Sequence, residues 1–257
     1  MSPRHWPRPA LATTALATTA LATTALATTA LALLAAAAVA GCSASASTSR
    51  AGATETAGVA AATGPKGYTA TQLKNALLTK VGGERPAAAA QAGDYGTLPD
   101  VQTSEQTIKD VKVAPAKCSA ATAAGFNSAA FSRAPAALVT FRVGRDGVSE
   151  VLVSASSQLA ETALSARLPT GCSHYRATLD GKTFSYTVSQ STLGGLADQA
   201  RALNVKASGY AQVDVWSVVY RGRGFVGAVT MVGPDATLPA VKTLASQSYS
   251  YAGQSLS

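Results

Sequence analysis

The sequence predicts a single α+β domain in which an antiparallel sheet built from β-hairpins is flanked by helices. Three pairs of β-prone segments are each separated by a short turn that contains glycine, which is the pattern of hairpins. Segments with helical spacing stand before, between and after these pairs. Strands grouped between helices are typical of α+β folds, and we expect helices to cover one face of the sheet.

The three predicted hairpins share arms with apolar residues at every second position. Their arms are residues 138–143 with 148–153, 174–179 with 183–189, and 211–220 with 225–232. Asp180 and Gly181 join the second pair, and Asp-Gly is favoured in two-residue hairpin turns. Residues 200–206 predict one more strand, in which Leu203 and Val205 point inward.

Helices are predicted from apolar spacing and from residues that cap helix ends. Thr69 and Gln72 form a capping box at the start of the first helix, which we expect to end at Gly82. Ser119 can cap a second, alanine-rich helix. Two further helices are expected at residues 157–167 and from residue 238 onward.

Residues 82–101 separate the first two predicted helices and contain four glycines and two prolines. Glycine and proline punctuate helices and strands. The segment therefore predicts a long loop, which is either mobile or part of a binding edge.

The composition excludes some classes of protein. The chain has 257 residues, of which 47% are hydrophobic, 6% aromatic and 13% charged. This balance is not that of a chain disordered over its whole length, and it argues against a large aromatic binding surface. The formal net charge is +8, but we expect no nucleic-acid partner because the N-terminal segment predicts export.

The N-terminal segment has the order of a secretory signal. Arg4 and Arg8 precede residues 10–40, which carry no charge. Val39-Ala40-Gly41-Cys42 resembles the bacterial lipobox, and this resemblance implies cleavage before Cys42 and attachment of diacylglycerol to its sulfur. The alternative is an uncleaved transmembrane helix within residues 10–40, which is long enough to span a bilayer.

These observations predict three regions along the chain. Residues 1–41 are expected to be a lipoprotein signal peptide, and residues 42–66 a disordered tether, since they contain almost no large apolar side chain. Residues 67–257 are expected to form the α+β domain. The predicted location is the extracytoplasmic face of the cell membrane, with the lipid bilayer as a partner through acylated Cys42.

Cys118 and Cys172 remain after the predicted lipidation site, 54 residues apart. Because two cysteines in an oxidising compartment most simply pair, we predict a disulfide between them. Two buried free thiols are the alternative. A metal site is not favoured, because the sequence has no CxxC motif and a single histidine beyond the leader.

The sequence offers few residues for catalysis. His174 is the one histidine after the leader, and a Ser-His-Asp triad would need it together with Asp180 or Asp214. There is no Gly-x-Ser-x-Gly elbow, and the acids form no DxD or ExxE pair. We therefore predict no catalytic residue, no metal and no cofactor, and a structural or exposed role for His174.

Arginines and aromatic residues at the predicted hairpins are the candidate ligand contacts. They are Arg145, Trp216, Tyr220, Arg221 and Arg223. Arginines at turns would favour an anionic envelope lipid or glycan. The alternative is that the arginines are solvated loop residues and that the aromatic residues belong to the core.

The order of these elements resembles the PknH-like extracytoplasmic sensor domain of actinobacterial membrane Ser/Thr kinases, which also occurs in free lipoproteins. The resemblance covers roughly residues 68–250. It depends on Pro115-Ala116-Lys117-Cys118 leading into a helix, on Pro169-Thr170-Gly171-Cys172 after a helix, and on Leu196-Ala197-Asp198-Gln199-Ala200 before a strand. It implies an antiparallel sheet flanked by helices, with a ligand-binding cleft. Family members commonly carry two disulfides, whereas this chain can carry one.

Three functions remain open at this point. The first is a membrane-anchored, non-enzymatic binding or sensor lipoprotein for an envelope ligand. The second is an envelope hydrolase that uses His174 as its base, and the third is a structural, wall-associated lipoprotein. The sequence does not identify the ligand, a partner kinase or transporter, or the oligomeric state.

Overall fold

The computed structural model describes residues 67–121, 126, 128–209 and 212–257. The predictions for residues 1–41 and 42–66, Cys42 included, lie outside the described residues. Within the described part, nine strands form one sheet: β1 (Gln91–Asp94), β2 (Lys112–Ala114), β3 (Pro135–Val143), β4 (Asp146–Ser154), β5 (His174–Leu179), β6 (Lys182–Leu193), β7 (Ala200–Gly209), β8 (Val213–Gly222) and β9 (Phe225–Val232).

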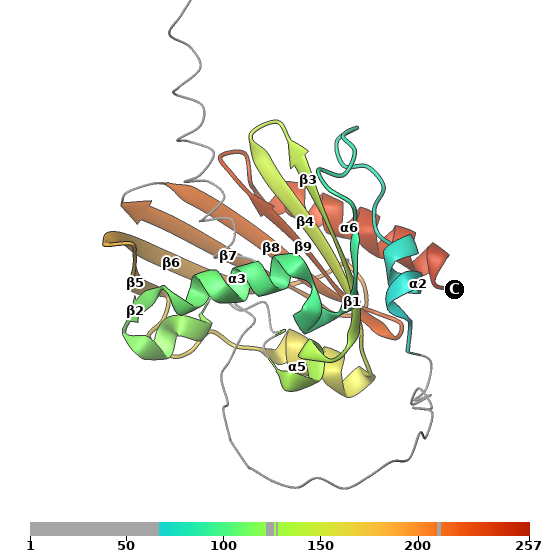
Figure 1. Cartoon of the computed structure of the whole chain (residues 1–257), viewed down its shortest axis with the longest axis horizontal. Coiled ribbons are helices and arrows are strands. Elements are labelled where there is room, and N and C mark those ends of the chain that lie inside the picture. Colours follow the sequence, from blue (N-terminus) through green and yellow to red (C-terminus); the bar gives the residue numbers. More distant parts are fainter. Residues whose placement is uncertain (1–66, 122–125, 127, 210–211) are drawn as a thin grey trace, which may run out of the picture.

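The sheet is antiparallel throughout, in the order β1-β3-β4-β9-β8-β7-β6-β5-β2 (Figure 1). The predicted α+β class and the three predicted hairpins are confirmed as β3–β4, β5–β6 and β8–β9. At the β5–β6 turn, Asp180 and Gly181 have φ angles of 51° and 73°, the left-handed pair that a type I′ turn requires. The strand predicted at 200–206 is β7, and Leu203 and Val205 are buried.

Helices cover both faces of the sheet, so the expectation of one covered face is wrong. α2 (Ala70–Asn75) and α6 (Leu238–Ser255) pack on one face, and α3 (Pro99–Lys109), α4 (Ala129–Ser132) and α5 (Ser157–Ser165) pack on the other (Figure 1). The reason is visible in β3, where Ala137 and Val139 join the core under α2 and α6, while Ala136 and Leu138 join the opposite core. A strand buried on both sides reads as a nearly continuous apolar run.

The first predicted helix begins as expected and ends early. In α2, the Gln72 N–H donates to Thr69 Oγ1 at 3.2 Å, and the Thr69 N–H donates to Gln72 Oε1 at 2.9 Å. The helix ends at Asn75 rather than Gly82, and the chain turns away. The Leu78 N–H then donates to the carboxylate of Glu150 on β4 instead of continuing a helix.

The predicted long loop at 82–101 is also wrong, because the segment pairs with the sheet. A bridge joins Val81 to Glu84, and another joins Pro86 to Phe141 on β3. β1 then pairs with β3 along the edge of the sheet, and a short 3-10 helix, Tyr95–Thr97, leads into α3. Proline at the first position of α3 fits because its missing N–H has no helical partner there.

Residues after Cys118 follow the prediction only in part. Ala116–Ala120 form a 3-10 helix, with Ser119 inside it rather than at its cap. Much of the predicted alanine-rich helix falls on residues 122–125 and 127, which lie outside the described residues. The helices predicted at 157–167 and from 238 are confirmed as α5 and α6.

Two aromatic residues fit over glycines at the β8–β9 hairpin. In this register Tyr220 lies opposite Gly227, and Phe225 lies opposite Gly222. A Cβ added at Gly227 would fall on the Tyr220 ring. Both glycines therefore leave space for aromatic rings that join the core under α6, and a larger residue at either position would overpack it.

A buried polar network fixes α6 to the sheet. Glu150 and Ser248 are fully buried, and both carboxylate oxygens of Glu150 have partners, the Ser248 hydroxyl and the Leu78 N–H, the latter at 2.7 Å. The Ser248 hydroxyl also bonds with the hydroxyl of Tyr220, which is equally buried. Burial raises the pKa of Glu150 to about 7, although the two hydrogen bonds act in the opposite direction.

We predict that Gly227→Ala destabilises the domain by about 1–3 kcal/mol, because the new methyl group displaces the Tyr220 ring. Gly147→Ala is the matched control, since Gly147 lies on β4 next to β9 and a Cβ there meets nothing within 4 Å. It should leave stability within about 1 kcal/mol of the wild type. Chemical denaturation measures both, and equal losses in the two variants would contradict the packing explanation.

We predict that the protein loses stability as the pH rises from about 4.5 to about 7. The folded state binds the Glu150 proton more tightly than the unfolded state, whose carboxyl has a pKa near 4.5. The stabilisation is therefore complete at a pH below the pKa of the unfolded state. About 3 kcal/mol of it is lost when the pH reaches the pKa of the folded state, about 7. Glu150→Gln should flatten the curve of unfolding free energy against pH, whereas exposed Glu84→Gln should not. An unchanged slope in Glu150→Gln would assign the pH dependence to other groups.

Candidate functional site

The predicted arginine contacts lie in turns at opposite ends of the strands β4 and β9. Arg145 is in the β3–β4 turn, where its guanidinium pairs with Asp235 at 3.4 Å. Arg221 and Arg223 belong to the β8–β9 turn region. In the β4–β9 register Gly147 faces Val232, whereas Ser154 faces Phe225, so the whole length of these strands separates the two turns. The structure therefore does not bring Arg145 together with Arg221 and Arg223.

The two predicted aromatic contacts face the core under α6. Tyr220 is fully buried and bonded to Ser248, which leaves it no surface for a ligand. Trp216 is half-buried and packs against the same core. Tyr220 is therefore a core residue, as the alternative interpretation had it, and Trp216 lies at the border of the same core.

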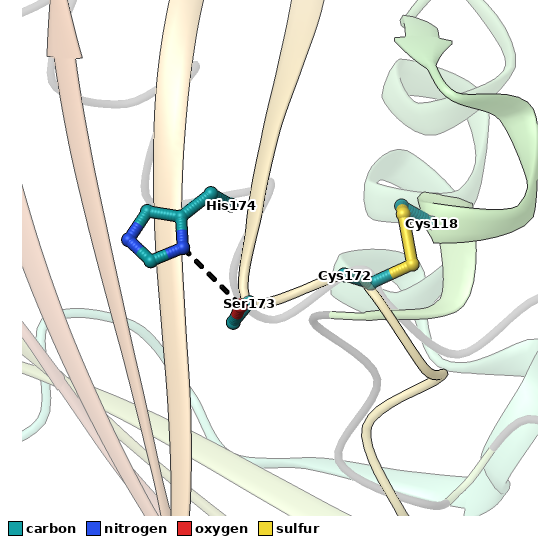
Figure 2. Close-up of a disulfide and its surroundings, with 4 residues drawn as sticks. All are labelled: Cys118, Cys172, Ser173 and His174. Carbon is teal, nitrogen blue, oxygen red and sulfur yellow. Dashed lines mark hydrogen bonds between the residues drawn. A yellow bond between two sulfur atoms is a disulfide. The ribbon is translucent and has the colours of Figure 1, made fainter.

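The structure does not assemble the triad that a hydrolase would need. His174 is exposed at the start of β5, and its Nδ1 lies 3.2 Å from the hydroxyl of Ser173 (Figure 2). Asp180 lies in the turn that follows the far end of the same strand. Asp214 instead accepts a hydrogen bond from Asn204 at 2.6 Å and pairs with Lys206 at 3.3 Å.

The predicted disulfide between Cys118 and Cys172 is confirmed (Figure 2). Their Cα atoms are 5.3 Å apart, within the range that a bridge requires, and both cysteines are fully buried. The bond ties the 3-10 helix at Ala116–Ala120 to the segment that enters β5. Residues around it form a third apolar core against β5, β6 and β7.

A cavity of about 380 Å³ lies where α5 ends above β6 and β7. Its walls are the last turns of α5, the segment that follows, the end of β6, the β6–β7 loop and the start of β7. The polar and charged side chains in the walls include Glu161, Arg167, Gln190, Thr192, Asp198 and Arg201.

Unequal strand lengths create this cavity. β5 pairs with β6 only as far as Thr187, while β6 continues to Leu193 beside β7. The last residues of β6 therefore have no strand on their outer edge. The chain between α5 and β5 crosses this edge instead, held by hydrogen bonds from the Leu168 N–H to Gln190 Oε1 at 2.9 Å and from the Val188 N–H to the Ser173 carbonyl at 2.8 Å.

Arg201 on β7 is the unusual residue of this cavity. Its exposed fraction is 6%. Its Nε donates to the Ala163 carbonyl in the last turn of α5 at 3.0 Å, but both terminal nitrogens are buried without a hydrogen-bond partner among the described residues. Burial, and secondly the charge of Arg167, lower the pKa of Arg201 to about 10. The guanidinium therefore still carries its charge at neutral pH.

Arg201 was not among the site residues predicted from the sequence. A signal was present, because Arg201 is the one charged residue in a mainly apolar segment predicted as a strand, from Ala200 to Val205. Buried arginines are rare unless they are paired. Among the predicted ligand contacts, Arg221 lies near the cavity, since its N–H donates to the carbonyl of the lining residue Gln199 at 3.0 Å.

The described residues contain neither a helix suited to cross a membrane nor a cluster suited to hold a metal ion. None of the helices there is both long and apolar enough to cross a membrane. In the same part of the chain, no group of three or more histidine, cysteine, aspartate or glutamate side chains is arranged to hold a metal ion.

No family model and no curated protein matches the chain. Among solved structures, the extracellular domain of PknH from Mycobacterium tuberculosis matches with a TM-score of 0.49 and 13% identity, over 75% of this chain and 98% of that one. An uncharacterized protein from Mycobacterium smegmatis, the Rv0999 ortholog, matches with a TM-score of 0.36 and 15% identity, over 75% and 96%. The chain thus resembles the PknH extracellular domain, as the sequence implied, and at these scores no ligand or activity is transferred from it.

Proposed function

We propose that this protein is a non-enzymatic binding module, held at the extracytoplasmic face of the cell membrane by acylated Cys42, which binds a small envelope ligand in the cavity between α5, β6 and β7. The observation that carries the proposal is the cavity itself. Its volume of about 380 Å³ lies within the range of small-molecule sites, which are concave and lined by a few convergent polar groups.

The cavity is built mainly on regular elements, which supports a binding role. α5 and the ends of β6 and β7 supply most of its walls, and sites on helices and strands hold their side chains more precisely than sites on loops. Hydrogen bonds fix the crossing segment to β6 at Gln190 and Val188. A ligand would therefore meet a largely preformed surface.

The chemistry of the lining favours binding over turnover. The described residues that line the cavity include no histidine, cysteine or lysine that could activate its serines, and its two carboxylates, on Glu161 and Asp198, are exposed. His174 lines no part of it and has Ser173 as its described partner. The two alternative functions are an envelope hydrolase that uses His174 and a purely structural lipoprotein. The experiments below test both of them.

The membrane anchor is the part of the proposal that depends on Cys42. Changing Cys42→Ala should leave the leader uncut at this position and remove the lipid. One acyl chain binds a bilayer only marginally, so retention requires the two or more chains of a lipoprotein. Intact mass of the membrane-extracted wild type should show diacylglycerol on Cys42, and a wild-type product that keeps its leader or is cut elsewhere would contradict the anchor.

Ligand binding in the cavity is tested by filling it. Thr192→Trp places an indole at the lining of the cavity, while Thr187→Trp places one on the same strand outside the cavity. In a thermal-shift screen of anionic envelope lipids and glycans, compounds that raise the melting temperature of the wild type should fail with Thr192→Trp and succeed with Thr187→Trp. If the ligand raised the melting temperature of both variants equally, the binding site would lie outside this cavity.

The same screen decides between the other two functions. Turnover of a generic hydrolase substrate that is abolished by His174→Ala would make the protein an enzyme. A wild type that shifts with no compound would favour the structural lipoprotein.

A further inference from the structure

We propose that the cavity recognises an oxyanion, the carboxylate or phosphate group of a small polyhydroxylated ligand, through the guanidinium of Arg201. The inference rests on the proposed function, since it takes the cavity between α5, β6 and β7 as the ligand site. It adds the chemical class of the ligand and the residue that selects it.

Arg201 has an unused binding capacity. Its two terminal nitrogens together carry four N–H groups, and these nitrogens are buried without a partner. The ion pairs found among the described residues are Arg145 with Asp235 and Lys206 with Asp214, so neither neutralises Arg201. An unpaired buried charge lowers stability, and a guanidinium is shaped to hold a carboxylate or phosphate with two parallel hydrogen bonds.

Other positive groups lie close to Arg201. Arg167 lines the same cavity, near enough for its charge to lower the pKa of Arg201. Arg221 is on the same face of the sheet, because Arg201 pairs with Val219 and Arg221 is two residues further along β8. Such diagonal neighbours are about 7–8 Å apart. An anion bound between Arg201 and Arg167 would relieve their repulsion.

The open edge of β6 adds neutral donors. The Val188 N–H points away from β7, since it donates to Ser173. Backbone groups alternate between the two edges of an antiparallel strand, and the β6–β7 register continues without interruption to Leu193. The N–H groups of Gln190 and Thr192, both residues of the cavity wall, are therefore directed to the edge that the chain between α5 and β5 crosses.

The other side chains of the cavity wall indicate the chemistry of the rest of the ligand. Glu161 and Asp198 are exposed carboxylates at the cavity, and they would accept hydrogen bonds from hydroxyl groups but repel a second anionic group. The hydroxyls of Ser165 and Thr192 can donate and accept. One oxyanion on a body rich in hydroxyl groups matches this set, as in a sugar acid, a sugar phosphate or a glycerophosphate headgroup.

The test uses the processed protein purified from membranes in a non-ionic detergent. The probes are glucuronate, glucose 1-phosphate and glycerophosphoglycerol, with glucose as the uncharged control, in isothermal titration calorimetry. These three anionic probes separate a sugar acid, a sugar phosphate and a lipid headgroup as sources of the same chemistry. At least one should bind, and glucose should bind about tenfold more weakly or not at all.

Variants of Arg201 assign the binding. Arg201→Met should abolish binding of the anionic probe while the domain stays folded, because the variant removes the unpaired charge and also the one hydrogen bond to the Ala163 carbonyl, which have opposite effects on stability. Arg201→Lys keeps the charge but loses the fork, and should weaken binding about tenfold. Arg176 is exposed on β5 and lies outside the cavity, so Arg176→Met should bind as the wild type does.

Two results would overturn the inference. The first is that none of the anionic probes binds the wild type at about 10 mM. The second is that a probe binds Arg201→Met as tightly as the wild type while Thr192→Trp still blocks it. In that second case the cavity remains the ligand site, so the proposed function would stand without its anion selectivity.

Discussion

The pairing of β4 with β9 is the contact on which the rest of this sheet depends. Eight residue pairs, from Gly147 with Val232 to Ser154 with Phe225, join strands that are more than 70 residues apart in the sequence. On one side of this junction lie β1, β3 and β4, and on the other lies the continuous meander from β9 back to β5. Most other neighbours in the sheet are joined by short connections, so without this pairing the sheet would separate into two parts.

Packing across the junction explains the buried network under α6. Glu150 on β4 and Tyr220 on β8 belong to strands on either side of β9, and Ser248 on α6 connects their side chains. Gly227 on β9 leaves the space that the Tyr220 ring occupies. The helix is thus held by both halves of the sheet, which makes its docking depend on their correct register.

Two buried ionisable groups in this fold are treated differently. Both carboxylate oxygens of Glu150 accept hydrogen bonds, and its raised pKa allows it to become neutral. Arg201 keeps its charge at neutral pH and has one of its three nitrogens paired. A buried polar group that is fully bonded is ordinary protein structure, whereas one left without partners calls for an explanation, and a bound anion is the one proposed for Arg201.

Features that depend on neighbours in the chain could be predicted from the sequence. Alternating apolar residues and an Asp-Gly turn predicted the hairpins, the capping box at Thr69 and Gln72 predicted where α2 begins, and the count of cysteines predicted the pairing of Cys118 with Cys172. The hairpins and the helix start are local patterns, and two remaining cysteines allow a single pairing, so no tertiary information was needed. The tertiary structure decided that residues 82–101 join the sheet and that helices cover both of its faces, because only long-range pairing reveals these contacts.

The candidate site was also decided by tertiary structure, for the same physical reason. The cavity exists because β6 outruns β5 and because α5 ends above Arg201, and strand lengths and helix docking are properties of the assembled sheet. The sequence placed arginines at turns, where solvent satisfies them, and Arg145 is indeed exposed and paired with Asp235. Whether a charged side chain is buried without a partner depends on the elements that pack against it. These elements come from distant parts of the chain, so no short stretch of sequence predicts them.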